Sequence, residues 1–338
     1  IEGLNGFYLQ GNGCTFNLQY PDLDWRGFMY FFACDDVWLE NFTIEYEVPN
    51  AISGKILSYD TENLSVTIEV DKEFNEFVSR LKKNKGTVWS YVEYNKITKI
   101  PQQGGNYIAD EASFYGYDIT GTAEQGYQLT LHFSDGVRSS FKATGVGNYV
   151  HIAFSYYVYN CLTFDFCGSS YLENITMHYS PAMGLVGTNN EHMYINRFQI
   201  RRKEGSNLLL TTAADGVHIV QQHGTIDITN CHNEYSQDDA YNIKSGVWYE
   251  FSGYNVVNKE ITISKKTIEI PAPRVGDVIE IYDYNTFEHK AALTVTEVKG
   301  TPLAYTLKVK ESIAKLGMGD WGACVVSNVT TAKLTFRN

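Results

Sequence analysis

The feature that most constrains this chain is a pentapeptide that nearly repeats itself 24 residues later, with an acid at the head of each copy. The first copy is Asp215–Ile219 (Asp-Gly-Val-His-Ile). The second is Asp239–Ile243 (Asp-Ala-Tyr-Asn-Ile), and Asp238 directly precedes it. This spacing is about the length of one turn of a β-solenoid. Copies on successive turns would stack roughly 4.8 Å apart, so we expect the three carboxylates to converge on one patch of surface.

A second repeat is longer. Cys34–Tyr46 aligns without gaps to Cys167–Tyr179, with every position offset by 133. Both copies contain an aromatic residue, then Leu-Glu-Asn, then alternating apolar residues that predict a strand. One such strand cannot bury its own apolar face, so neighbouring units must stack as in a parallel β-helix. The same pattern recurs at His192–Ile200, Gly224–Asn230 and Val326–Thr330.

Asp35-Asp36 is a double acid that serves as an internal comparison. It aligns with Gly168-Ser169 in the longer repeat, which indicates a tight turn. A double acid alone therefore predicts little, and the interest of Asp238-Asp239 lies in its stacking with Asp215.

The solenoid pattern is interrupted twice. Between the periodic segments the chain has short alternating strands with Gly and Asn or Asp turns, which predict two small inserted antiparallel β-barrels. The segment 71–85 is charged and amphipathic and predicts one short helix. We expect an all-β fold divided into first coils at 1–51, a barrel at 52–145, coils with the acids at 146–246, a second barrel at 247–325 and resumed coils at 326–338. We also expect further coils after Asn338, because a solenoid needs a cap.

Composition excludes several classes of function. The formal net charge of −12 argues against nucleic acid or an anionic membrane as the main partner. No apolar stretch is long enough to span a membrane. The six cysteines form no CxxC pair and no zinc-site spacing, so we expect small buried residues and no metal site.

Clustered carboxylates are what hydrolysis of a glycosidic bond requires, because one must donate a proton and another must activate water or attack. Acids stacked about 5 Å apart would suit a retaining pair. Asp238 and Asp239 are adjacent and should point in different directions, so one of them can lie farther from Asp215 with room for water, which favours inversion. An Asp/Asn ladder that caps turns is the structural alternative, and spacing alone does not separate the two.

The polar residues beside the acids favour a site. His218 and Asn242 occupy equivalent positions in the two copies and Lys244 follows, so together they offer a surface that can bind sugar hydroxyls. Four further residues near strand ends are candidates for the sugar site, although a structural role fits each as well: His178, Tyr156, Trp248 and Arg201.

The motifs around these acids resemble glycoside hydrolase family 110. The resemblance covers 212–218, 224–231 and 238–243, and also 38–46, the segment after Gly54, and 180–185. It implies a right-handed parallel β-helix and an inverting exo-α-galactosidase that removes terminal α-1,3-linked galactose, with Asp215, Asp238 and Asp239 as the catalytic acids. It implies no metal or organic cofactor. The partner is then a glycan with terminal α-galactose and the location periplasmic or secreted, and the barrels could mediate a homodimer.

Three alternatives stay open. Gln237-Asp238-Asp239 also resembles polygalacturonases of glycoside hydrolase family 28, a pattern that would make Asp238 the acid. The Gly-His and Arg-x-Lys motifs of that family are not found after Gly246. A polysaccharide lyase on the same architecture would use a Lys or Arg base. A non-catalytic glycan-binding solenoid predicts an exposed aromatic stripe over several coils.

Overall fold

The computed structural model describes residues 1–21, 23–154, 159–244, 248–265, 272–314, 324–328 and 333–337. Strands dominate it, and the predicted all-β class is confirmed. Within these residues the α-helix is α1 (Asn75–Lys83), which lies inside the predicted helical segment. No helix in the described part of the chain is long and apolar enough to cross a membrane.

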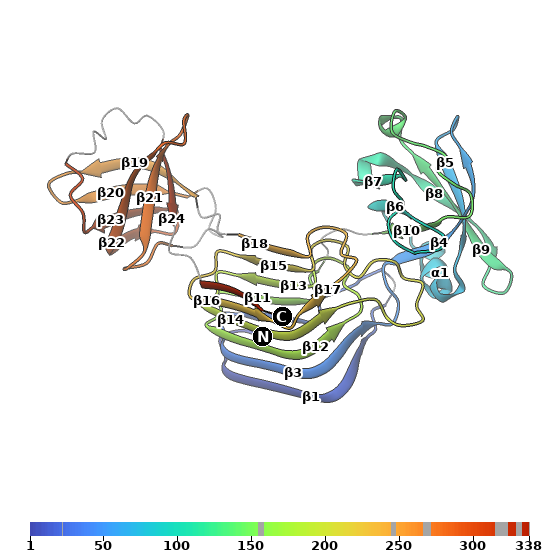
Figure 1. The fold of residues 1–338 in the computed structure, drawn as a ribbon, viewed down its shortest axis with the longest axis horizontal. Helices are drawn as coiled ribbons and strands as arrows, with labels where there is room; N and C mark the ends of the chain where they lie inside the picture. The colour runs from blue at the N-terminus through green and yellow to red at the C-terminus, as the bar shows by residue number, and fades with distance from the viewer. Residues whose placement is uncertain are drawn as a thin grey trace.

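Two parallel sheets form the middle of the molecule, and the chain alternates between them (Figure 1). The first parallel sheet contains β1 (Asn5–Leu18), β3 (Asp35–Tyr46), β12 (Ser169–Met177), β14 (His192–Ile200), β16 (Thr225–Thr229) and β25 (Lys333–Arg337), and β17 (His232–Asn233) also pairs with β14. The second parallel sheet contains β2 (Met29–Phe32), β11 (Leu162–Asp165), β13 (Leu185–Thr188), β15 (Val217–Val220) and β18 (Tyr241–Lys244).

Both sequence repeats correspond to strands that pair in register. Trp38 of β3 lies opposite Tyr171 of β12, which matches the offset of 133. His218 of β15 lies opposite Asn242 of β18, which matches the offset of 24. The predicted stacking of the two repeats is therefore confirmed.

The core lies between the parallel sheets, where alternate side chains of each strand point inward. Leu39, Leu172, Ile195 and Ile228 occupy one such inward row and are at most 2% exposed. Burial of an aliphatic side chain of this size contributes about 1.5–3 kcal/mol to stability. Each strand obtains that contribution only from its stacked neighbours, which explains why the apolar alternation repeats along the chain.

A left-handed corner recurs in the first parallel sheet and explains the Asn of the Leu-Glu-Asn motif. Asn41, Asn174, Arg197 and Asn230 have φ values of 59°, 53°, 53° and 54°. Asn tolerates this backbone region better than most residues with a Cβ. The corners also bond to one another, because Asn174 Nδ2 donates to Asn41 Oδ1 at 2.8 Å. Asn at positions 41 and 174 thus fits the left-handed corner and also supplies a hydrogen bond between two neighbouring corners.

Asn174→Ala should lower the free energy of unfolding by about 1–2 kcal/mol, because it places an ordinary side chain at positive φ and removes one hydrogen bond. Asn174→Gly should lower it less, because glycine accepts that φ without strain. Urea unfolding of both variants tests this. Equal losses in the two variants would show that the corner conformation is not what the Asn provides.

The first insertion is a seven-stranded antiparallel sheet in the order β7-β6-β10-β4-β5-β9-β8. Its strands are β4 (Ala51–Asp60), β5 (Ser65–Val70), β6 (Ser90–Tyr94), β7 (Tyr107–Ala109), β8 (Phe114–Thr122), β9 (Gly126–Phe133) and β10 (Tyr149–Ala153). In the described residues the terminal strands β7 and β8 do not pair, so this sheet is not a closed barrel as expected. The expected boundary at 145 is also too early, because β10 pairs with both β4 and β6.

The second insertion is a closed antiparallel barrel, as expected. Its strands are β19 (Trp248–Asn255), β20 (Glu260–Ser264), β23 (Ala304–Val309), β22 (His289–Thr301), β21 (Val278–Asp283) and β24 (Cys324–Asn328). The barrel therefore extends past the expected boundary at 325. β25 then pairs in parallel with β16, so the chain returns to the first parallel sheet. In Figure 1 the two insertions lie on opposite sides of the parallel strands.

The cysteines whose side chains are described are free thiols. Cys34, Cys161 and Cys167 are buried in the core, as expected, whereas Cys14 is exposed and Cys231 is half-buried. Burial raises the pKa of the Cys161 thiol to about 12, so this group stays protonated and acts as a small apolar residue.

Candidate active site

The acid cluster forms where the chain enters two adjacent strands of the second parallel sheet. Asp215 lies two residues before β15, and Asp239 lies two residues before β18. Since these strands pair in register, the acids are brought together with Asp238 beside them. One carboxylate oxygen from each of the three acids lies within 4.8 Å of the others. The predicted convergence is confirmed, whereas the catalytic role of the acids stays a prediction.

Asp215 is the fixed member of the cluster. Its side chain is 2% exposed, and the Asp239 backbone N–H donates to Oδ1 at 3.2 Å. The Asn242 side-chain amide donates to Oδ2 at 3.2 Å, and His218 Nδ1 lies 2.5 Å from the same oxygen. Asp238 and Asp239 are exposed. The site therefore combines one carboxylate locked by protein donors with two that face solvent.

Gly216 explains why the first copy of the repeat reads Asp-Gly. A Cβ at this position would overlap the side-chain amide of Asn233. That amide donates to the Ala240 carbonyl at 2.6 Å, and the Gly216 N–H donates to the Asp239 carbonyl at 2.9 Å. The absence of a side chain at Gly216 lets the two acid-bearing segments approach this closely. Asn233 was not among the residues predicted from the sequence, which carries no signal for it apart from the glycine.

The remaining predicted site residues are spread over the molecule. Lys244 is exposed at the end of β18. His178 follows β12, and its Nδ1 lies 3.0 Å from the carbonyl oxygen of Arg201, which follows β14. Trp248 is exposed on the barrel strand β19. Tyr156 lies outside the described residues.

Of the substrate-binding predictions, His218 and Asn242 therefore join the acid cluster. Among the described residues no hydrogen bond links His178, Arg201 or Trp248 to the three acids. His178 and Arg201 follow strands of the first parallel sheet, whereas the acids precede strands of the second. His178 and Arg201 thus lie at the start of connections between the two sheets, and the acids lie at the end of such connections.

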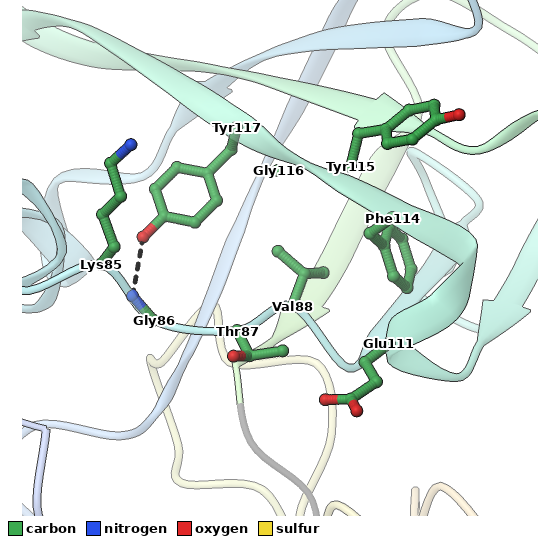
Figure 2. A pocket seen from close by; sticks show the side chains of 9 residues that line it. All are labelled: Lys85, Gly86, Thr87, Val88, Glu111, Phe114, Tyr115, Gly116 and Tyr117. Carbon is green, nitrogen blue, oxygen red and sulfur yellow. Dashed lines mark hydrogen bonds between the residues drawn. The ribbon is translucent and has the colours of Figure 1, made fainter.

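A cavity of about 250 Å³ lies in the first insertion between 85–88 and β8 (Figure 2). Figure 2 shows the Tyr117 hydroxyl beside the Gly86 N–H, which donates to it at 2.9 Å. The lining contains one carboxylate, Glu111, and none of the three clustered acids. A lone carboxylate cannot supply both partners of acid–base hydrolysis. The acid cluster therefore remains the candidate site.

The three acids are also the one group of His, Cys, Asp and Glu side chains, among the described residues, that lie close enough to share a metal ion. Calcium prefers six to eight oxygen ligands. Both oxygens of Asp215 already face donors from the protein itself, namely Asp239, Asn242 and His218. Asp215 is thus engaged by protein donors, whereas Asp238 and Asp239 are exposed, and the surroundings of Asp215 fit a hydrogen-bonded carboxylate better than a calcium ligand.

Addition of 1 mM Ca²⁺ or Mn²⁺ should leave the thermal unfolding midpoint unchanged, because a ligand that binds only the folded state would raise it. Differential scanning fluorimetry in chelator-treated buffer measures this. The interpretation fails if the midpoint rises by several degrees and Asp215→Asn abolishes the rise.

No family model matches this sequence. Two curated proteins are similar to it. α-1,3-Galactosidase B of Bacteroides thetaiotaomicron is 22% identical over 263 residues, which cover 72% of this chain and 39% of the relative. α-1,3-Galactosidase A of Shewanella woodyi is 28% identical over 75 residues, or 22% of this chain and 12% of the relative. The alignments thus span less than half the length of these relatives.

Both names confirm the resemblance to glycoside hydrolase family 110 that the motifs indicate. At this identity and coverage the similarity supports a general glycosidase family for the chain. The galactosidase activity itself is that of the relatives.

Proposed function

We propose that this chain is a glycoside hydrolase that removes terminal α-1,3-linked galactose from glycans with inversion of configuration. Its parallel strands would form a right-handed parallel β-helix, interrupted by two inserted domains. The observation that carries the proposal is the cluster of one buried and two exposed carboxylates on the segments that lead into two adjacent strands. The names of the two curated relatives add support for the substrate.

In this mechanism one acid protonates the leaving oxygen while the others hold the attacking water. A water bonded to two carboxylates at about 2.7 Å each needs oxygens no more than roughly 5.4 Å apart. The separation of at most 4.8 Å satisfies that condition. It is shorter than the roughly 6.5–9.5 Å of a two-carboxylate inverting pair and would by itself suit a retaining pair. The proposal of inversion therefore depends on two acids sharing one water, with the third as proton donor.

The polar residues around Asp215 orient its carboxylate. His218 and Asn242 fix its Oδ2, and both lie on strands of the second parallel sheet next to the exposed acids. Sugar hydroxyls that reach Asp238 and Asp239 would meet the free faces of these side chains. Lys244, two residues beyond Asn242, is proposed as a further hydroxyl ligand at the edge of the site.

The location and the partners that we propose follow from the substrate class. Glycans with terminal α-galactose lie outside the cell, so we expect a periplasmic or secreted protein. The net charge of −12 is consistent with a neutral oligosaccharide and with no role in binding nucleic acid or a membrane. The insertions offer surfaces through which two copies could dimerise.

Incubation with α-1,3-galactobiose should release galactose, and NMR of the anomeric proton should show the β-anomer first. Asp215→Asn, Asp238→Asn and Asp239→Asn should each lower kcat by about 10²–10⁴-fold, because each removes a group that transfers a proton or holds water. Asp36→Asn is the matched control, since this exposed acid lies at the start of β3, in the first parallel sheet. Its kcat should stay within about twofold of the unmodified protein, as for most surface changes.

Each contrary outcome has a separate meaning. Initial release of α-galactose would establish retention and reject the shared-water mechanism. Products with the absorbance of an unsaturated sugar would indicate a lyase. The absence of any release would reject the galactoside, and α-galacturonides and sulfated galactans would be tested next.

One observation bears on a second candidate, a non-catalytic glycan-binding solenoid. An aromatic row crosses the outer face of the first parallel sheet through Tyr8, Trp38, Tyr171 and Tyr194. The Trp38 and Tyr171 ring centroids lie 3.9 Å apart, and those of Tyr171 and Tyr194 lie 4.8 Å apart, both stacked. These rings cover one another's faces, so little stacking surface remains for a sugar except beside Tyr8 and Trp38, which are 62% and 39% exposed. The row fits a stabilising ladder better than a binding platform.

The double substitution Tyr8→Ala and Trp38→Ala should therefore leave kcat and KM for α-1,3-galactobiose within about twofold. Tyr115→Ala, at an aromatic side chain that is 76% exposed in the first insertion, is the control for loss of an exposed ring. The binding solenoid would instead be supported if the double variant lost glycan affinity in calorimetry while Asp238→Asn retained it.

A further inference from the structure

The acid-bearing segment before β18 is held by a strand of the first insertion. Ser90, the first residue of β6, is fully buried, and its hydroxyl donates to Oε1 of Gln237 at 3.1 Å. Gln237 directly precedes Asp238, and its own N–H donates to the Thr212 carbonyl at 3.0 Å. Both the side chain and the backbone of the residue before the exposed acids are therefore fixed.

Arg202 makes a second link between the same strand and the same segment. Its guanidinium carbon lies 3.3 Å from the ring centroid of Tyr235 and 5.8 Å from that of Tyr94, the last residue of β6. The guanidinium also donates to the carbonyls of Leu209 at 2.9 Å and Lys99 at 3.0 Å. Cation–π contacts of a desolvated guanidinium are among the stronger ones. Tyr235 lies two residues before Gln237, so the segment is held at two points.

The segment that leads to Asp215 rests on β6 as well. Val92 and Tyr94 of β6 form a small buried cluster with Leu209 and Leu210, and Tyr149 of β10 packs against it. Asp215 follows Leu210 by five positions along the chain. The strand β6 thus contacts both chain segments that contain the clustered acids. Contact of both segments with one strand constrains where their acids lie relative to each other.

We propose that β6 is a positioning element for the acid cluster and that Ser90, acting through Gln237, is a positioning residue for Asp238 and Asp239. The effect of Ser90 on catalysis rests on the proposed function. The effect of Ser90 on the position of the acid-bearing segment does not. The hydroxyl of Ser90 holds the Gln237 side chain, Gln237 directly precedes the two acids in the chain, and Arg202 anchors the segment at Tyr235. Loss of the hydroxyl leaves Gln237 Oε1 without this donor and lets the acids move relative to Asp215.

Hydrogen–deuterium exchange of the full chain tests the structural part in Ser90→Ala. The backbone amides of 234–239 should exchange about 10-fold faster than in the unmodified protein, while the remaining β6 amides and the thermal unfolding midpoint stay unchanged. Ser53→Ala is the matched control, because Ser53 is equally buried in the same antiparallel sheet and its side chain faces His151. Unchanged exchange at 234–239 in Ser90→Ala would overturn the proposal.

Kinetics with α-1,3-galactobiose test the catalytic part. Ser90→Ala should lower kcat on the order of 10-fold with KM within about twofold, because displaced acids weaken the transition state more than substrate binding. Ser53→Ala should match the unmodified protein. Gln237→Ala should lower kcat similarly, and the double variant Ser90→Ala with Gln237→Ala should fall no further, since both changes remove one interaction.

The outcomes separate this proposal from the proposed function. Faster exchange at 234–239 with unchanged kcat would overturn the positioning role, and so would additive losses in the double variant. If the unmodified protein releases no galactose, the proposed function fails, and the exchange experiment still decides whether β6 fixes the acid-bearing segment.

Discussion

In-register pairing of parallel strands is the constraint on which the rest of the structure depends. A strand in such a sheet has a fixed register with its neighbour, so a slip by one residue would turn its apolar side chains away from the core. The inward row from Leu39 to Ile228 holds that register through the first parallel sheet. The same constraint in the second sheet places His218 opposite Asn242. The acids that precede β15 and β18 meet because burial of the apolar side chains of these strands permits only one register between them.

The three acids of the cluster have different surroundings, so their carboxylates differ in how freely they can move and contact solvent. Asp215 is buried, and its two oxygens face donors from Asp239, Asn242 and His218, so the protein fixes its orientation. Asp238 and Asp239 keep their oxygens toward solvent and toward whatever molecule binds there. A site that must hold one group still while others exchange protons with a substrate needs such a division.

Sequence reasoning predicted the features that local pattern controls. The offsets of 24 and 133 between repeats are the registers of the paired strands, and the acids converge for that reason. The boundary of the first insertion could not be predicted in the same way, because the sequence of Tyr149–Ala153 resembles that of a strand in the parallel sheets. Only its pairing with β4 and β6 shows that it belongs to the antiparallel sheet. The contact between Ser90 and Gln237 joins residues 147 positions apart, and neither residue has a sequence pattern that predicts the other.

The placement of the first insertion explains how the fold tolerates it and uses it. Its two ends meet, because the Phe154 N–H donates to the Asn50 carbonyl at 3.0 Å. A long excursion with adjacent ends costs little more closure entropy than a short one, so β3 and β12 pair directly although the insertion separates them in sequence. Since Asn50 also accepts a hydrogen bond from the Tyr179 hydroxyl of the next turn, the base of the insertion is tied to the parallel strands. These bonds fix where the insertion leaves the parallel strands, and from that position β6 contacts the acid-bearing segments from outside the parallel core.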